Sequence, residues 1–426
     1  MRPAAARIVG AGATPLTGPG PARGGPGDAV GLCVRALRAA LDDAGMALGD
    51  LDTLIALPPL MGSGHMMAAH AVAQAAGLTP RRGLLCRTLD VGGAGPVAAL
   101  LAAARAVQHE GRAAVAVVAG DAVASVPTAE FLARADAACR PREGGVAAVP
   151  SPVIPHLYDR VAAWHMATRG TTREQLAMCA SLMTLQASRH PGALERRPRP
   201  LAEVLASPPV ASVTTKLECA RRADGAAALI VAAAGSRCDG PAVRVSVLGG
   251  GEGSGPLVPP AQLSEECFSA ASAAAAAYAA AGLAPSDIDH WGLYDCFPVC
   301  FVRAIEAVGL APDGGRYVEQ QYARLLGPAG PLECAAAGGG GGDERAPAPV
   351  WPVNTHGGLL GGGAPWEAPA AFSLVEAVTQ LRGEAAGRQV AGARHALVYA
   401  NGGVFSASAV AILEGGVGGR AGPSRL

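Results

Sequence analysis

The feature that most constrains the fold of this 426-residue chain is an internal repeat. Residues 44–55, A-G-M-A-L-G-D-L-D-T-L-I, recur 237 positions later as residues 281–292, A-G-L-A-P-S-D-I-D-H-W-G. In each copy an alanine-rich segment precedes the glycine, which suits the left-handed position just past the end of a helix. The Asp-x-Asp that follows leads into an apolar strand. Two copies of one helix–turn–strand unit predict a chain built from two similar halves.

A second, weaker repeat relates R-A-A-V-A-V-V-A-G-D at residues 112–121 to R-H-A-L-V-Y-A-N-G-G at residues 394–403. Helical patterns alternate with short Val/Leu/Ile runs along the first half. The expected strands there are residues 6–10, 51–57, 84–90, 113–119 and 226–233, and the expected helices are residues 27–44, 68–76 and 96–109. This alternation predicts parallel sheets joined by helical crossovers.

Composition excludes several classes of protein. Half of the residues are apolar and 16% are charged, which is typical of a globular chain with large buried cores. Net charge is zero, so long-range attraction favours neither nucleic acid nor an anionic membrane. The longest apolar run, residues 268–283, is mostly alanine, so we expect no membrane span, and we expect no signal peptide. Ten cysteines without a C-x-x-C pair indicate a reducing compartment and argue against a zinc ribbon.

The C-terminal part carries a recognisable set of motifs. They are V-N-T-H-G-G-L-L at residues 353–360, S-L-V-E-A-V-T-Q-L-R-G-E at 373–384, R-Q-V at 388–390 and A-L-V-Y-A-N-G-G-V at 396–404. They predict a strand, a glycine turn, an amphipathic helix and a second strand that ends in a glycine turn. This part resembles the C-terminal half of the thiolase superfamily, most closely the branch of the sterol carrier protein-x thiolases. Two more segments, residues 157–177 and 223–231, resemble parts of the thiolase loop domain and its exit strand.

The resemblance implies an α/β, duplicated thiolase fold. It has two βαβαβαββ halves in α-β-α-β-α layers, with a helical loop domain inserted in the first half. Residues 1–240 would form the N-terminal half, with the loop domain at about 121–222 and helices over 156–169 and 172–188. The C-terminal half would span residues 241–415. The glycine-rich patch at 335–349 and the tail at 416–426 are expected to be flexible surface.

Thiolases bring four loops to one pocket, and the first holds a nucleophilic cysteine at a helix N-terminus, which lowers a thiol's pKa. The corresponding run here is L-D-V-G-G-A-G-P at residues 89–96, and Gly93 takes the place of the cysteine. Gly93 is therefore a substrate-binding candidate, not a nucleophile. The nearest thiol, Cys86, lies within the preceding strand and is expected to pack. Without a thiolate at this position, the family's covalent acyl-enzyme cannot form.

The second loop normally reads Asn-Glu-Ala-Phe or His-Asp-Cys-Phe, and here it reads Tyr294-Asp295-Cys296-Phe297. We take Tyr294 and Asp295 as candidate catalytic residues. A phenol titrates near pH ~10, so Tyr294 serves as a hydrogen-bond donor or weak acid more readily than as a base. The alternative is a tyrosine that packs at the end of a strand.

The third loop, Gly-His-Pro in thiolases, is Gly-Ala-Pro at residues 363–365, so the family's base is missing. His356, eight residues before the alanine, either is a structural hydrogen-bonding residue or takes over proton transfer in the same pocket. The fourth loop lacks the usual Cys-x-Gly thiol. Its Asn401, Gly402 and Gly403 stay substrate-binding candidates, because backbone N–H groups can stabilise an oxyanion. Since ligands collect at the carboxyl ends of parallel strands, we expect Tyr294, His356 and this glycine turn to share one pocket.

Two further signals are weaker. Arg221, with Arg222 and the basic residues 189–199, could meet the phosphates of coenzyme A, or these arginines could form an ordinary solvated surface. Gly10-Ala-Gly12 follows a strand and mimics a dinucleotide fingerprint. A proline stands where the third glycine belongs and no helix starts there, so a Rossmann site is disfavoured.

Two functions follow from this pattern. The first is an enzyme that makes or breaks a carbon–carbon bond in a coenzyme A thioester, as in the steroid side-chain retro-aldolases that the chain resembles. Those enzymes act with a small partner built from an OB-fold and a zinc ribbon, and the reaction needs no nucleophile. The second is a non-catalytic acyl-CoA- or lipid-binding protein, or a structural subunit of a complex with such a partner.

The remaining expectations concern assembly and location. We expect a homodimer paired through the strand at residues 84–90, no permanently bound cofactor, no metal, and a coenzyme A thioester as substrate. The cytoplasm is the favoured location. The alternative is the peroxisome, because Ser424-Arg425-Leu426 resembles the Ser-Lys-Leu address.

Overall fold

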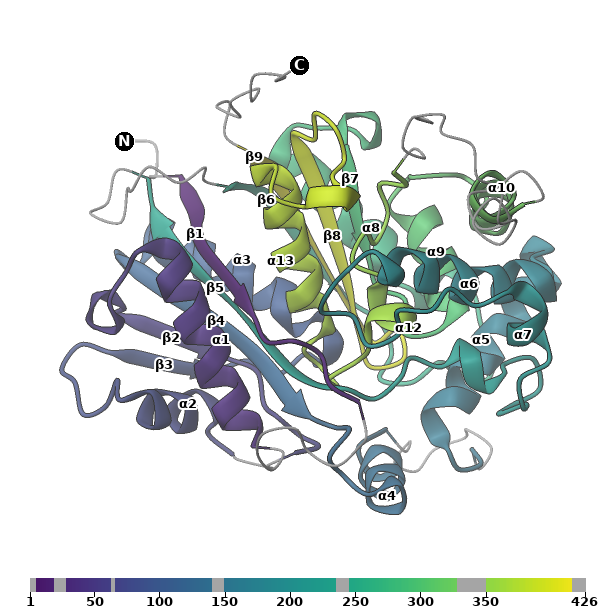
Figure 1. Ribbon diagram of the computed structural model, residues 1–426, viewed down its shortest axis with the longest axis horizontal. Helices are drawn as coiled ribbons and strands as arrows, with labels where there is room; N and C mark the ends of the chain where they lie inside the picture. Colours follow the sequence, from purple (N-terminus) through teal and green to yellow (C-terminus); the bar gives the residue numbers. More distant parts are fainter. Residues whose placement is uncertain are drawn as a thin grey trace, which may run out of the picture.

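A computed structural model describes residues 5–18, 28–62, 66–139, 149–234, 245–327 and 350–415. Its centre is one mixed nine-stranded sheet in the order β3-β2-β4-β5-β1-β6-β9-β8-β7 (Figure 1). The strands are β1 (Ala6–Ala13), β2 (Thr53–Ala56), β3 (Leu85–Thr88), β4 (Ala114–Ala122), β5 (Asp224–Ala233), β6 (Val245–Ser254), β7 (His290–Leu293), β8 (His395–Gly402) and β9 (Ala407–Gly415). The α/β thiolase fold expected from the sequence is confirmed.

The sheet reads almost the same from its two ends, because β2-β4-β5-β1 mirrors β7-β8-β9-β6. The halves join where β1 meets β6, through the pairs Arg7–Ser246 and Ile8–Val245. The predicted repeat is present in detail: each copy ends a helix at a left-handed glycine, Gly45 with φ 63° and Gly282 with φ 69°. Each copy then continues through a short 3₁₀ turn into β2 or β7.

One edge of the sheet breaks this symmetry. On the first-half side, β3 pairs with β2 in parallel over four residues. On the other side, the strand expected at the start of residues 353–360 is reduced to a single bridge between Val353 and Trp291. The chain turns at once, because Asn354 adopts a left-handed φ of 46° and Gly357 one of 101°. This turn corrects the expected strand and redirects the side chains that follow it.

Helices cover both faces of the sheet and fill the space between the halves. Helices α3 (Gly95–His109) and α13 (Pro369–Arg382) contact each other and strands of both halves, so they form the middle layer. The outer layers are α1 (Ala29–Ala44) and α2 (Ala68–Ala76) on the first half and α8 (Ala270–Ala281) on the second (Figure 1). Helix α9 (Pro298–Ala307) follows β7, and α10 (Gly314–Leu326) follows α9.

Glycines in the two central strands allow outer helices to pack closely. A Cβ at Gly12 in β1 would lie 2.5 Å from the backbone nitrogen of Ala40 in α1. In β6, a Cβ at Gly249 would lie 2.6 Å from the nitrogen of Ala281 in α8. The glycine pattern that mimics a dinucleotide fingerprint therefore belongs to a continuous strand against an alanine-rich helix.

The segment between β4 and β5 forms a separate helical group. It contains α4 (Thr128–Cys139), α5 (Val153–Arg169), α6 (Arg173–Ser188) and the short α7 (Leu201–Leu205). Helices α5 and α6 match the two helices predicted in this region, and a capping box of Thr172 and Gln175 opens α6. Helix α4 was not predicted. Both α5 and α6 contact α9 of the C-terminal half (Figure 1), and Arg134 of α4 donates a hydrogen bond to the Met61 carbonyl oxygen of the first half.

Among the helices in the described ranges, none has both the length and the hydropathy needed to cross a bilayer. The glycine-rich patch at 335–349 and the tripeptide Ser424-Arg425-Leu426 lie outside the described residues.

Candidate functional site

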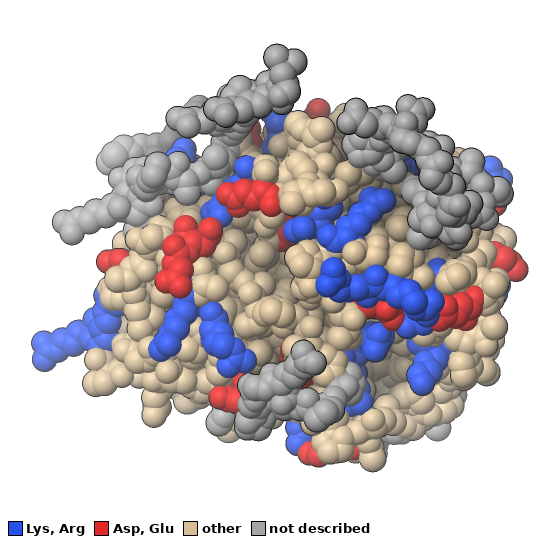
Figure 2. Space-filling model, viewed as in Figure 1, with Lys and Arg blue, Asp and Glu red and all other residues tan. Residues whose placement is uncertain are grey.

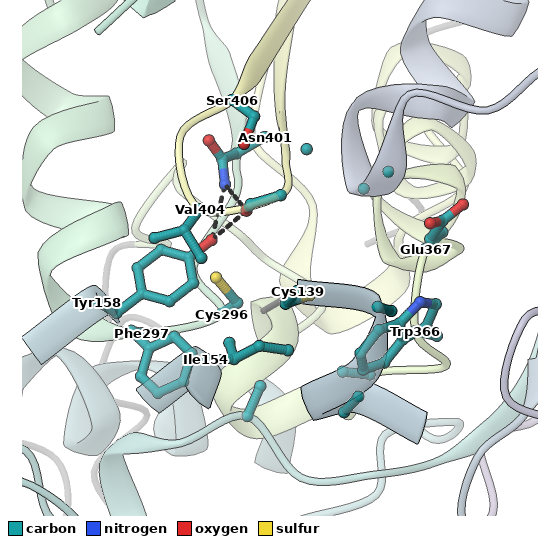
Figure 3. Close-up of a pocket in the computed structure, with 18 of the residues that line it drawn as sticks. Cys139, Ile154, Tyr158, Cys296, Phe297, Trp366, Glu367, Asn401, Val404 and Ser406 are labelled. Atoms are coloured by element: carbon teal, nitrogen blue, oxygen red, sulfur yellow. Dashed lines mark hydrogen bonds between the residues drawn. The ribbon is translucent and has the colours of Figure 1, made fainter. Parts of the chain in front are cut away.

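A cavity of about 650 Å³ opens where the helical group meets the carboxyl ends of β7 and β8 and the start of α3 (Figure 3). Its walls are largely apolar. Aromatic and aliphatic side chains line it, among them Phe131 and Leu132 of α4, Ile154 and Tyr158 of α5, Phe297 and Trp366. Cavities of this size and character are typical of sites for large organic ligands.

Gly93 lies at this cavity, just before α3, where no side chain fits. A Cβ on Gly93 would overlap the hydroxyl oxygen of Tyr294 and would come within 2.6 Å of the backbone oxygen of Asn401. The phenol thus occupies the space in which a side chain at position 93 would begin. The substitutions at positions 93 and 294 are therefore sterically linked.

Tyr294 follows β7 directly and is 6% exposed, with its side chain lining the cavity. Burial raises its pKa well above the usual value, and the nearby Cys296 and Cys300 thiols raise it further. Tyr294 is therefore a neutral phenol at physiological pH, able to donate a hydrogen bond but not to act as a phenolate base.

The two glycine turns expected at the site meet backbone to backbone. A Cβ on Gly92 would lie 2.8 Å from the nitrogen of Gly403, and one on Gly402 would overlap the carbonyl oxygen of Val91. Gly92, Gly402 and Gly403 all line the cavity. Side chains at these positions would push the turns apart, so the glycines keep the first and fourth loops in contact.

Asn401 is held in place by a tyrosine from the inserted helices. Its amide nitrogen donates to the Tyr158 hydroxyl over 2.9 Å and to the Gly403 carbonyl oxygen over 3.2 Å. The Tyr158 hydroxyl donates to the same carbonyl oxygen over 2.8 Å (Figure 3). The Tyr158 ring stacks on Phe297 with centroids 4.5 Å apart. Sequence reasoning missed Tyr158, because its local pattern is that of any half-buried helical aromatic residue.

Asp295 does not line the cavity, unlike its neighbour Tyr294. It is fully buried, and its two oxygens accept hydrogen bonds from the backbone N–H groups of Leu359 (2.7 Å) and Leu360 (3.1 Å) in α12 (Gly358–Gly362). Burial raises its pKa to about 7. Asp295 was expected to be a catalytic residue of the cavity. The structure instead shows its carboxyl bound to the backbone of α12.

His356 also lies away from Tyr294, which corrects the expectation that the two share one pocket. Because the chain turns at Asn354, the imidazole faces α13, with Nε2 3.5 Å from the Ser373 hydroxyl. It lines a separate cavity of about 220 Å³ beside His190 and Glu376. Burial lowers the pKa of His356 to about 3.

Of the two arginines proposed to meet coenzyme A phosphates, one lines the cavity and the other does not. Arg222 lines the cavity and lies over the Phe131 ring, 4.8 Å from its centroid, whereas Arg221 pairs with Glu195. In the basic stretch, Arg197 and Arg199 both pair with Glu203. Figure 2 shows positive and negative side chains interspersed on this face of the molecule. Within the basic stretch, Arg197 and Arg199 are therefore paired with neighbouring carboxylates.

The cavity lining also contains three thiols and the carboxyls of Asp90, Asp136 and Glu367. Cys139, Cys219 and Cys296 line it, and burial raises the pKa of Cys139 to about 11 and that of Cys219 to about 12. Ala364 presents its methyl group where the family's histidine was expected, and Glu367 follows closely. Sequence reasoning missed Glu367, although it is the only charged residue between positions 354 and 376. No group of three His, Cys, Asp or Glu residues suited to a metal ion occurs in the described ranges.

Comparison with known proteins agrees with this architecture. The family described as thiolase C-terminal domain-like matches residues 261–345 and 341–415. An acetyl-CoA acetyltransferase of Methanothermobacter thermautotrophicus is 32% identical over 264 residues, covering 61% of this chain and 63% of the relative. Bovine sterol carrier protein 2 is 30% identical over 263 residues, covering 59% of this chain and 44% of the relative.

The alignments thus span less than two thirds of the length of these relatives. Among solved structures, the Ltp2-ChsH2(DUF35) aldolase superposes with a TM-score of 0.76 at 23% identity, over 97% of this chain and 98% of the other. The continuous sheet and the mirrored halves are those of the thiolase fold. The C-terminal part of the chain matches a thiolase family, and the chain is similar to an acetyl-CoA acetyltransferase and to sterol carrier protein 2.

Proposed function

We propose that this protein breaks or forms a carbon–carbon bond in a coenzyme A thioester by an aldol or retro-aldol reaction, without an acyl-enzyme. One observation carries the proposal: the Tyr294 hydroxyl occupies the space in which a side chain at Gly93 would begin. A buried neutral phenol thus lies where a thiolase would place its nucleophile. The similar acetyltransferase and the similar aldolase are named for reactions at acyl thioesters and at carbon–carbon bonds, which supports this chemistry.

The reaction needs three things from the protein and none of them is a nucleophile. A base must take the proton of the β-hydroxyl group, so that the Cα–Cβ bond breaks and the electron pair passes into the thioester enolate. Hydrogen-bond donors must stabilise the enolate oxygen, and an acid must return a proton to Cα. The backbone amides around Gly93 and Gly403 are suitable donors. Tyr294, kept neutral by burial, is suited to be the acid.

The residues that line the cavity favour a substrate with a bulky apolar acyl group. A volume of about 650 Å³ lined by Phe131, Ile154, Phe297 and Trp366 offers aromatic and aliphatic contact but few hydrogen-bonding groups. We further propose a homodimer through β3 and a complex with a second protein, the latter supported by the pairing of Ltp2 with ChsH2(DUF35) in the similar aldolase.

The non-catalytic alternative rests on a different observation. Both Gly93 and Ala364 lack the reactive groups of a thiolase, while the cavity itself is preserved. A protein with these features could bind an acyl-CoA or a lipid without converting it. The same assay separates the two functions.

Purified protein, with and without an OB-fold/zinc-ribbon partner, should be incubated with a panel of β-hydroxyacyl- and β-ketoacyl-CoAs while cleavage products are followed by mass spectrometry. We expect cleavage of β-hydroxyacyl-CoAs with bulky apolar chains. Tight binding of the panel with no turnover under either condition would favour the non-catalytic alternative.

Replacing Tyr294 tests its role directly. Tyr294→Phe should lower turnover about 10²-fold or more, as expected for loss of a catalytic acid or donor, with thermal stability nearly intact. Tyr322→Phe, on α10 outside the cavity lining, is the matched control and should change neither. A Tyr294→Phe protein that melts early shows a structural tyrosine, and one with full activity rejects the acid role.

A further inference from the structure

Glu367 lies in the short link between α12 and α13, and its side chain lines the cavity (Figure 3). It is 8% exposed, and its Oε2 atom is completely buried without a hydrogen-bond partner. No hydrogen bond or ion pair of this carboxyl occurs in the part of the chain that the structure describes. Buried carboxyl groups are normally paired, because an unpartnered one costs the desolvation free energy of the group.

The other buried acids near the site have partners that Glu367 lacks. Asp295 accepts two backbone hydrogen bonds from α12, and Asp121 at the end of β4 accepts them from Met61 (2.9 Å) and Gly62 (2.7 Å). These contacts explain both carboxyls as anchors of the backbone. Glu367 has no such structural explanation, and it is turned to the cavity.

We infer that Glu367 is the catalytic base of this site, working opposite the Tyr294 acid on a β-hydroxyacyl thioester. The inference rests on the proposed function and adds to it the missing group. The geometry that carries it is an unpartnered carboxyl and a neutral phenol that line one apolar cavity.

The proton and electron balance closes with these two residues. The Glu367 carboxylate takes the proton of the β-hydroxyl, the oxygen becomes a carbonyl, and the Cα–Cβ bond breaks. Its electron pair forms the thioester enolate, and Tyr294 gives its phenolic proton to Cα. The phenolate then recovers a proton from the Glu367 carboxylic acid, directly or through water. The products are a ketone or aldehyde and a shortened acyl-CoA, with no net gain or loss of protons and no oxidant.

The charges around Glu367 favour a strong base. Burial, and then the carboxylates of Asp90 and Asp121, raise its pKa to about 8. Tyr294 and the Cys139 thiol, both within its electrostatic reach, have their own pKa values raised in part by it. The remaining charged groups of the cavity are Asp136 on α4 and Arg222, whose guanidinium donates to the Val126 carbonyl and the Thr128 hydroxyl. A more basic carboxylate removes a hydroxyl proton more readily.

The first test is Glu367→Gln, which keeps the shape of the side chain but cannot accept the proton. We expect kcat to fall 10²–10⁴-fold while binding of a non-cleavable acyl-CoA thioether changes less than threefold. Glu252→Gln, an exposed residue of β6 paired with Arg105, is the control and should keep wild-type kcat. Should Glu367→Gln fail to fold, Glu367→Asp keeps a carboxyl one methylene further back. That variant should lose most of kcat yet keep the same pH dependence.

The second test is the pH profile of kcat/KM. A base must be ionised, so activity should rise with pH through about 8 in the wild-type protein. Asp90→Asn removes a neighbouring negative charge, lowers the pKa of Glu367 and should move this rise to lower pH. Infrared spectroscopy should find a protonated carboxyl band that titrates over the same range and is missing in Glu367→Gln.

The outcomes separate this inference from the proposed function. A wild-type protein that cleaves no thioester overturns the proposed function and the catalytic role together. An active Glu367→Gln protein within twofold of wild type overturns only the assignment of the base. So does an unmoved pH profile in Asp90→Asn, or a set of titrating carboxyl bands that is the same in Glu367→Gln as in the wild-type protein.

Discussion

At the scale of single residues, the main feature of the site is that the Tyr294 hydroxyl fills the space next to Gly93. Glycine at position 93 and tyrosine at position 294 depend on each other, since the hydroxyl of Tyr294 lies where the Cβ of residue 93 would be. Restoring a cysteine at Gly93 alone therefore would not restore a thiolase site, because its first side-chain atom has no room. A nucleophilic side chain at position 93 would therefore require the residues that pack around it to change as well.

A double-mutant cycle measures this dependence. Gly93→Ala should destabilise the fold by about 1–3 kcal/mol through overpacking. Combining it with Tyr294→Phe should recover part of that loss, because the overlapping hydroxyl is removed, although the Asn401 carbonyl oxygen still crowds the position. Urea unfolding of the four proteins gives the coupling free energy, and strictly additive losses would show that the two positions do not interact.

The same packing predicts that no acyl-enzyme forms. After incubation with acetyl-CoA, no cysteine should carry a stable acetyl group, and Cys86 in particular should stay free because burial raises its pKa. Peptide mass spectrometry after rapid acid quenching tests this. An acetylated Cys86 or Cys296 peptide would return the protein to covalent chemistry.

At the scale of elements, one buried acid joins the second loop to the third. Asp295 follows β7 and accepts two hydrogen bonds from α12, the short helix that precedes the Gly-Ala-Pro turn. A methyl-sized substituent would leave two buried N–H groups without acceptors. Asp295 thus holds the loop after β7 and the loop after α12 in a fixed relative position.

We expect Asp295→Ala to destabilise the protein by about 2–4 kcal/mol, since each unsatisfied buried donor costs about 1–3 kcal/mol. Asp313→Ala, which removes the exposed N-cap of α10, is the control, and its expected loss is about 1 kcal/mol. Thermal unfolding ranks the two. Equal small losses would mean that the α12 amides find water or other acceptors.

At the scale of the whole molecule, the duplicated sheet has two unequal ends. On one side, β3 is a full edge strand, and on the other its counterpart is only the Val353–Trp291 bridge. The backbone N–H groups of Leu85 and Leu89 donate to residues 52 and 56 on the β2 side. Alternation along the strand turns the N–H of Cys86 to the open edge, where a second copy of the chain could pair.

This edge allows a sharp test of the proposed dimer. Cys86→Pro removes an outward-facing donor and leaves the pairing with β2 intact, so it should shift sedimentation at micromolar concentration from dimer to monomer. Cys86→Ala removes the thiol but keeps the N–H, and it should stay dimeric. A wild-type protein that sediments as a monomer without a partner would reject pairing through β3.

Local sequence determined the elements and their repetition. The helix ends at Gly45 and Gly282, the 3₁₀ turns after them and strands β2 and β7 follow from short-range rules of capping and apolar periodicity. The motifs of residues 353–404 were sufficient to predict the thiolase fold. The glycine turns that contain Gly93 and Gly402–Gly403 were predicted to bind substrate, and they line the cavity. These features depend on neighbours within a few residues, which a single sequence displays.

Only the tertiary structure decided which side chains face the cavity. One turn at Asn354 directs His356 to α13, and two backbone contacts direct Asp295 to α12, although both had looked like partners of Tyr294. Tyr158 and Glu367 enter the site from segments 136 and 73 positions away from Tyr294. The direction of a side chain after a strand depends on a few backbone dihedral angles and on packing against residues far away in the sequence. The local pattern of apolar and polar residues predicts neither of them.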